Sequence, residues 1–150
     1  MRYMLIMQAP ESMLVGETAG PPESEEHADR EAFEAMGRYN TELVDAGVLL
    51  AAEGLTPSAD GFVVTHDGES ASVTDGPFAE AKELVAGFWI LEVASREEAV
   101  QWARRCPIGP GVTLEVRRIA ELSDLEGVAP AEVLDAEATL RRRVAERDQV

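Results

Sequence analysis

The first eight residues predict a strand that is apolar on both of its faces. Side chains alternate along a strand, so Leu5 would point to one face and Met4 and Ile6 to the other. A strand of this kind is covered on both sides, as the central strands of a sheet are. Residues 87–93 repeat the pattern and predict a second central strand.

Two segments carry the spacing of amphipathic helices. Apolar residues recur every three or four positions in residues 25–46, which predicts a long first helix. The apolar positions are Phe33, Met36, Tyr39, Leu43 and Val44. Ser95 and Glu98 form a capping box that begins a second helix, which ends before Pro107. Between them, the prolines and glycines of residues 9–24 predict a long loop with neither helix nor strand.

Three further stretches predict shorter strands. Residues 47–55 are aliphatic and close on a glycine, which indicates a strand. Residues 62–64 and 70–74 flank the turn sequence His66-Asp67-Gly68 and predict a β-hairpin. Residues 112–119 alternate apolar and polar side chains, as a half-buried strand does.

The predicted order, β-α-β-β-β-β-α-β, is that of an α+β fold with a ferredoxin-like split βαβ sheet and both long helices on one face. The second face of the sheet then has no cover within the chain, although its central strands are apolar there. A second copy of the chain is the economical cover, so the sequence predicts a homodimer.

The last thirty residues differ in character from the rest. Residues 120–138 contain six acids and no base, and residues 139–148 contain four arginines. We expect a domain over residues 1–120 and a helical extension over residues 121–150, with its helix at about 130–147. Its apolar stripe is too thin for a core of its own, so it should dock on the body or on a partner subunit.

Composition narrows the function classes. The 150 residues include 29 acids and 13 bases, a net charge of −16, which opposes binding to nucleic acid. No apolar run approaches the roughly 20 residues of a membrane helix, and no secretory signal is recognisable, so we expect a cytoplasmic protein away from membranes. The lone Cys106 excludes a disulfide framework and is expected to be packed at a helix end.

Asp75 is the first candidate for chemistry. A carboxylate at the mouth of a sheet could act as a general base or bind a ligand, with Arg2, Tyr3, Glu53 and His66 as its expected neighbours. The alternative is structural, since an aspartate before Gly-Pro commonly accepts backbone N–H groups of its own turn.

Other polar residues have weaker claims. Lys82, the chain's one lysine, is a candidate anion contact, but a charged stretch after a turn is more often a solvated face. His27 and His66 lack the spacing of metal ligands, so no metal site is expected. Arg141, Arg142 and Arg143 could form a patch for an acidic partner, and they are equally well explained by favourable charge near a helix C-terminus and by pairing with the acids upstream. No nucleotide, flavin or haem motif is present, so we expect no cofactor.

The sequence Asp75-Gly76-Pro77-Phe78-Ala79-Glu80-Ala81-Lys82-Glu83, followed by the predicted strand at 87–93, resembles the YCII-related proteins of the DGPF type. The likeness covers about residues 1–119. It implies a dimeric α+β barrel, in which two ferredoxin-like units pack sheet against sheet. It also implies an association with extracytoplasmic-function sigma factors.

One branch of the YCII-related proteins is suspected of chemistry that uses a histidine and an aspartate. Counting back from Ala46-Gly47 to the position of that histidine reaches Met36, so the histidine is missing here. Our first hypothesis is therefore a small homodimeric binding or accessory protein with a small-molecule ligand in its cleft, linked through the resemblance to sigma-factor regulation. The alternative is a small cofactor-independent enzyme, similar to a lyase or isomerase, that acts on a small organic substrate.

Overall fold

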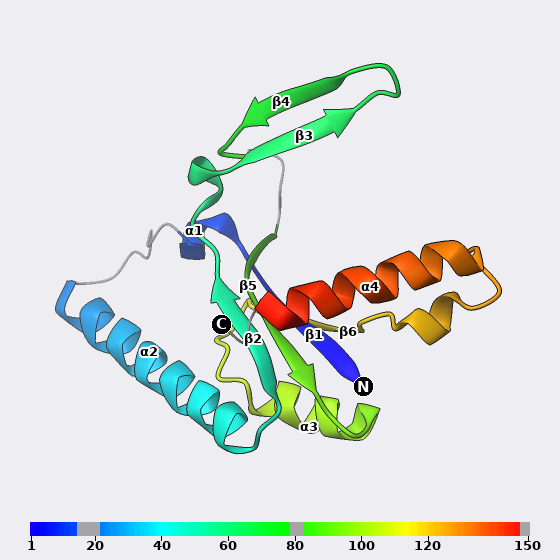
Figure 1. Ribbon diagram of the computed structural model, residues 1–150. Helices are drawn as coiled ribbons and strands as arrows, with labels where there is room; N and C mark the ends of the chain where they lie inside the picture. Colours follow the sequence, from blue (N-terminus) through cyan, green and yellow to red (C-terminus); the bar gives the residue numbers. More distant parts are fainter. Residues whose placement is uncertain (15–21, 79–82, 148–150) are drawn as a thin grey trace. The chain divides into compact units, whose positions relative to one another are not determined.

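A computed structural model describes residues 1–14, 22–78 and 83–147 of the protein (Figure 1). The chain divides into two compact units, Met1–Arg118 and Ile119–Val150. The elements of the first unit are β1 (Arg2–Ala9), α1 (Glu11–Leu14), α2 (Pro22–Asp45), β2 (Leu49–Gly54), a 3₁₀ turn at Ser58–Asp60, β3 (Phe62–His66), β4 (Ala71–Asp75), β5 (Leu84–Glu92), α3 (Arg96–Arg105) and β6 (Thr113–Arg118). The second unit has a 3₁₀ turn at Leu122–Leu125 and α4 (Ala131–Arg147).

The main sheet has four strands in the order β2-β5-β1-β6. Every neighbouring pair in it is antiparallel. This order is that of a ferredoxin-like sheet, with the β3–β4 hairpin inserted between β2 and β5. The predicted α+β, ferredoxin-like fold is confirmed.

Both long helices cover the same face of the main sheet, as predicted. The buried core joins sheet residues to α2 and α3, and its members include Leu5, Leu91, Tyr39, Leu43, Ala99 and Trp102. The rings of Tyr39 and Trp89 meet edge to face with centroids 6.1 Å apart. The Tyr39 hydroxyl donates a hydrogen bond of 3.2 Å to the carbonyl of Trp102, which ties α2 to α3.

The opposite face of the sheet has an apolar centre. Met4 lies across from Ile90, and Ile6 lies across from Phe88. All four side chains are half-buried. On β6, Arg117 and Glu115 are the partners of Met4 and Ile6, and on β2 Glu53 is the partner of Phe88. Charged side chains thus border an apolar strip at both edges of the sheet.

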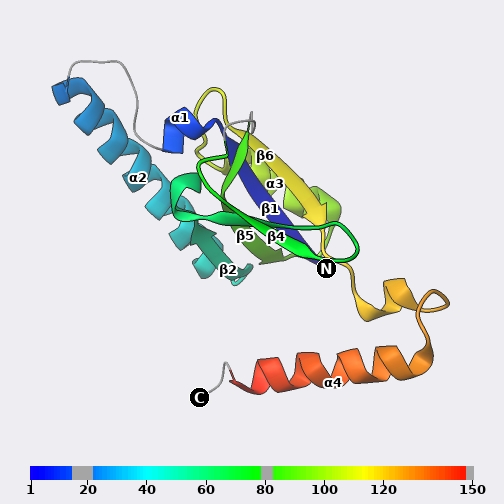
Figure 2. The ribbon, with the colours of Figure 1, turned by 90° about the horizontal axis from the view of Figure 1, so that it is seen from above.

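The predicted hairpin is confirmed as β3 and β4, which form a separate two-stranded sheet. Seen from above in Figure 2, the hairpin projects over the end of the main sheet. All ten of its strand residues are exposed. In its turn, the Asp67 carboxylate accepts the backbone N–H groups of Glu69 and Ser70 at 2.9 and 2.7 Å. These hydrogen bonds, first that from Ser70, lower the pKa of Asp67.

The residues after β4 connect the hairpin to the body. Gly76 donates a backbone hydrogen bond of 2.9 Å to Gly61, and Phe78 N–H donates one of 3.2 Å to the hydroxyl of Ser58. The Ser58 hydroxyl in turn donates to the carboxylate of Glu11 in α1. Ser58 is a buried polar residue, and these partners satisfy its hydroxyl group.

The prediction of a helix-free loop over residues 9–24 was wrong. A short helix forms at Glu11–Leu14, and α2 begins at Pro22. Pro10 directly precedes the short helix, and Pro22 is the first residue of α2. A proline suits these positions because the first N–H groups of a helix have no partner within it. The carbonyl of Pro10 accepts the Met13 N–H at 3.0 Å.

The apolar stripe of α2 is only partly buried. Tyr39 and Leu43 belong to the core, but Phe33 is 80% exposed and Val44 is 59% exposed. Helical spacing predicted all of them on one stripe, and it could not show how far the sheet extends beneath the helix.

The helix that begins at Ser95 is confirmed as α3. The Ser95 hydroxyl accepts the Glu98 N–H at 3.1 Å, as a capping box requires. The Glu98 carboxylate accepts the backbone N–H of Ala94 at 2.8 Å. A capping box would have it accept the N–H of the next residue, Ser95. Cys106 ends the helix and is buried, as predicted.

The second unit contains the predicted C-terminal helix. Arg141 of α4 pairs with Glu137 at 3.5 Å and with Glu121 at 3.7 Å. Val133, Leu140 and Val144 expose about half of their surface. Arg141 thus pairs with upstream acids, as its place in the sequence predicted.

Candidate functional site

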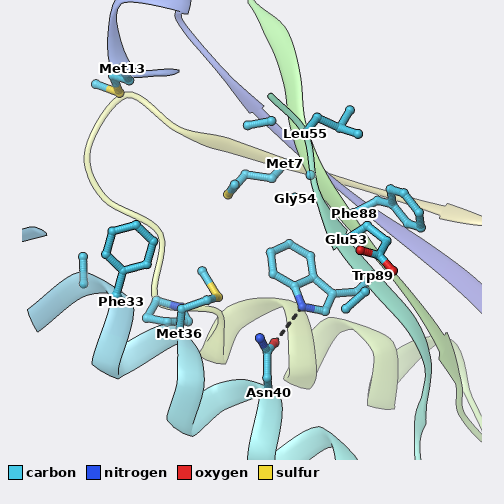
Figure 3. A pocket seen from close by; sticks show the side chains of 15 residues that line it. Met7, Met13, Phe33, Met36, Asn40, Glu53, Gly54, Leu55, Phe88 and Trp89 are labelled. Atoms are coloured by element: carbon cyan, nitrogen blue, oxygen red, sulfur yellow. Dashed lines mark hydrogen bonds between the residues drawn. The ribbon is translucent and has the colours of Figure 1, made fainter. Parts of the chain in front are cut away.

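The first unit contains a cavity of about 590 Å³ between α2 and the strands β2 and β5 (Figure 3). Its walls are mainly apolar, and three of the protein's five methionines line it. Its large apolar lining residues are Met7, Met13, Phe33, Met36, Leu55, Phe88 and Trp89.

Small residues on the two strands leave this cavity open. Ala52 and Gly54 of β2 and Ala86 and Gly87 of β5 all line it. Gly54 and Gly87 are cross-strand partners. A Cβ at Gly87 would lie 2.8 Å from the carbonyl oxygen of Glu53, so a side chain does not fit where these strands meet.

Asn40 supplies a polar group to the cavity. Its Oδ1 accepts a hydrogen bond of 2.9 Å from the indole N–H of Trp89, drawn as a dashed line in Figure 3. α2 and β5 position these two side chains from opposite walls. The indole N–H can only donate, so this bond fixes which end of the amide faces Trp89.

Charge is sparse at this cavity. Among the described lining residues, Glu53 is the one titratable side chain. Glu53 and Phe88 lie beside the cavity, but their side chains point to the other side of the strands from Trp89 (Figure 3). The site can therefore enclose an apolar molecule and offer it an amide.

The structure separates the predicted site residues. Glu53 borders the cavity, whereas Tyr3 is buried in the core and Arg2 lies at the start of β1. His66 and Asp75 are exposed at the two ends of the hairpin, opposite Ala71 and Phe62 respectively. These residues are not brought together around Asp75.

Two other candidates lie partly or wholly outside the described residues. Lys82 is not described, and for His27 only its place in α2 is. Cys106 is 7% exposed, and burial raises the pKa of its thiol to about 11. No group of three or more His, Cys, Asp or Glu side chains in residues 1–14, 22–78 and 83–147 could hold a metal ion.

Comparison with known proteins places the fold in a family. The model of the YCII-related domain matches residues 1–123. The chain belongs to the YCII-related domain family. It is 33% identical over 76 residues to the uncharacterized protein R00369 of Rhizobium meliloti (strain 1021). The match covers 51% of this chain and 61% of that relative, so the chain spans about three fifths of the relative's length. None of the described helices is both long and apolar enough to cross a membrane.

One residue of the cavity was already singled out by the resemblance to YCII-related proteins. Met36 occupies the position counted for the missing histidine, and it lines the cavity. Sequence reasoning missed Asn40 and Phe33 as cavity residues. An asparagine on the apolar stripe between Met36 and Leu43 was the signal that could have identified it.

Proposed function

We propose that this YCII-related protein is a homodimeric binding protein that takes a small, largely apolar molecule into the cavity between α2 and the sheet. The cavity carries the proposal. Its volume of about 590 Å³ and its apolar walls with one amide match the usual composition of small-molecule sites.

The lining favours binding over the enzyme alternative. An enzyme of the lyase or isomerase type needs convergent acid and base groups within reach of its substrate. Among the described lining residues only Glu53 titrates, and its side chain points away from the cavity (Figure 3).

The homodimer is supported by the face of the main sheet opposite α2 and α3. Met4, Ile6, Phe88 and Ile90 form an apolar centre there, bordered by charged side chains on β2 and β6. An apolar core with a polar rim is the usual anatomy of a protein interface. A second copy of the same face would bury it, as the dimeric α+β barrel of the resemblance implies.

Three finer assignments stay predictions from the sequence. They are the DGPF type, a cytoplasmic location and a link to extracytoplasmic-function sigma factors. A ligand-binding dimer is compatible with a regulatory role, and the strongly acidic composition argues against direct contact with DNA.

Binding of the neutral fluorophore phenylnaphthylamine tests the proposal. We expect saturable binding that Gly54→Leu abolishes, because position 54 lies on the cavity side of β2 with Ala52 and a Cβ there meets nothing within 4 Å. Gly37→Leu is the matched control, since Gly37 is exposed on α2, does not line the cavity and also has open space. Binding that survives Gly54→Leu unchanged, or no binding at all, would contradict the proposal.

A further inference from the structure

The orientation of the Asn40 amide determines what it can offer a ligand. Because Oδ1 accepts the Trp89 N–H, Nδ2 is left as the free end of the side chain. None of the described residues accepts a hydrogen bond from Nδ2. Asn40 is half-buried and lines the cavity, and Figure 3 shows its amide directed from α2 into the space beside Met36 and Trp89. A donor in this position prefers a ligand that carries an acceptor.

The groups around Asn40 favour a flat, unsaturated ring. The Trp89 indole lies on one side of the cavity, and the thioethers of Met36 and Met7 and the exposed ring of Phe33 lie around it (Figure 3). Sulfur atoms and aromatic rings make favourable contacts with aromatic faces and edges. Methionine side chains also adapt to different ring shapes.

The electrostatics favour a ligand without charge. No Lys, Arg or His is among the described lining residues, and Glu53 lies at the border. A carboxylate or phosphate would have no cation to compensate its desolvation, and a net charge of −16 opposes its approach. A cationic ammonium group would leave the Nδ2 donor without an acceptor.

We infer that the cavity selects neutral aromatic compounds that carry a carbonyl oxygen, such as aryl ketones, with that oxygen bound by Nδ2 of Asn40. This inference rests on the proposed function and adds the chemical class of the ligand. Trp89 has a double role: it supplies the ring surface, and through its N–H it holds the Asn40 amide in the donating orientation.

Three probes of one shape test the inference by equilibrium dialysis against the full-length protein. Acetylnaphthalene is neutral and has a carbonyl acceptor, isopropenylnaphthalene has the same shape without the oxygen, and naphthoate has a charge. One neutral hydrogen bond corresponds to about a 5–10-fold preference for the ketone over the hydrocarbon. We expect naphthoate to bind more weakly than either.

Asn40→Asp is the variant that isolates the donor. The aspartate keeps the size of the side chain and an oxygen for the Trp89 N–H but loses the NH₂ group. The ratio of ketone to hydrocarbon affinity, measured on this variant with both probes, should therefore fall to about one. The probe series on the unaltered protein stands as a test even if this variant folds poorly.

The outcomes separate the inference from the proposed function. If the hydrocarbon binds as tightly as the ketone, and Gly54→Leu blocks both, the carbonyl preference is wrong and the binding function stands. If naphthoate binds most tightly, the inference of a neutral ligand is wrong. If none of the three binds and phenylnaphthylamine does not bind either, both the inference and the proposed function are wrong.

Discussion

The backbone carbonyl of Ser58 occupies the space that a side chain at position 76 would need, and Gly76 leaves that space free. This close approach holds the strand end of β4 against the 3₁₀ turn that precedes β3, where Gly76 N–H also bonds to Gly61. The second residue of the Asp-Gly-Pro-Phe sequence thus has a packing reason to be glycine.

Gly76→Ala should destabilise the first unit. The added methyl group would collide with backbone rather than with a flexible side chain, so we expect a loss of about 1–3 kcal/mol in the free energy of unfolding. Urea titration followed by circular dichroism measures it. Gly61→Ala is the matched control, because its Cβ would lie 3.5 Å from the same carbonyl, an ordinary contact. Equal stability of the two variants would show that the turn yields easily.

Ile90→Asp should dissociate the proposed homodimer. Ile90 lies at the centre of the sheet face opposite α2 and α3, so a dimer through this face would bury an unpaired carboxylate. We expect association to weaken by at least about 100-fold, measured by sedimentation equilibrium. Val44→Asp introduces the same change at an exposed position on α2 and should leave the mass unchanged. A monomeric wild-type protein at micromolar concentration would refute the dimer.

Cys106 should react slowly with thiol reagents in the folded protein. Burial raises the pKa of its thiol from about 9 to about 11, so the thiolate fraction near pH 8 falls about 100-fold. Cys106 is also only 7% exposed, which limits access of the reagent. Alkylation by iodoacetamide with and without urea measures the difference.

The same pKa shift predicts alkaline sensitivity. The unfolded chain loses the thiol proton near pH 9, whereas the folded chain keeps it to about 11. The free energy of unfolding should therefore fall as pH rises from 9 towards 11. Cys106→Ala should reduce this fall without removing it, since burial also raises the pKa of Tyr39. An identical pH dependence in the variant would contradict the assignment.

Truncation after Ala120 should leave a folded body. The hydrophobic core cluster that joins the main sheet to α2 and α3 is formed within Met1–Arg118. We expect a cooperative thermal transition within a few degrees of that of the full chain, followed by circular dichroism. Loss of the transition would show that residues 121–150 are needed to fold the body.

Local pattern was sufficient to predict most of the elements of this protein. The apolar run within residues 1–8, the Ser95–Glu98 cap and the His66-Asp67-Gly68 turn each act over a few residues, and each formed where predicted. The order of these elements, with the need to cover apolar faces, was enough to predict the ferredoxin-like sheet. The short helix at Glu11–Leu14 was missed because the prolines of residues 9–24 were interpreted as helix breakers, whereas a proline is also common at the start of a helix.

The candidate site was decided by tertiary structure alone. Asn40 and Trp89 are 49 residues apart, and only the packing of α2 on β5 brings their hydrogen-bonding groups together. The cavity depends on small residues of β2 and β5 coming into register, which strand pairing sets and no local sequence window contains. Asp75, the most prominent carboxylate of the sequence motif, lies instead on an exposed hairpin. Sequence thus determined the local periodicities and turns, because their causes are short-range, and the fold determined which side chains share a cavity, because that depends on contacts between distant segments.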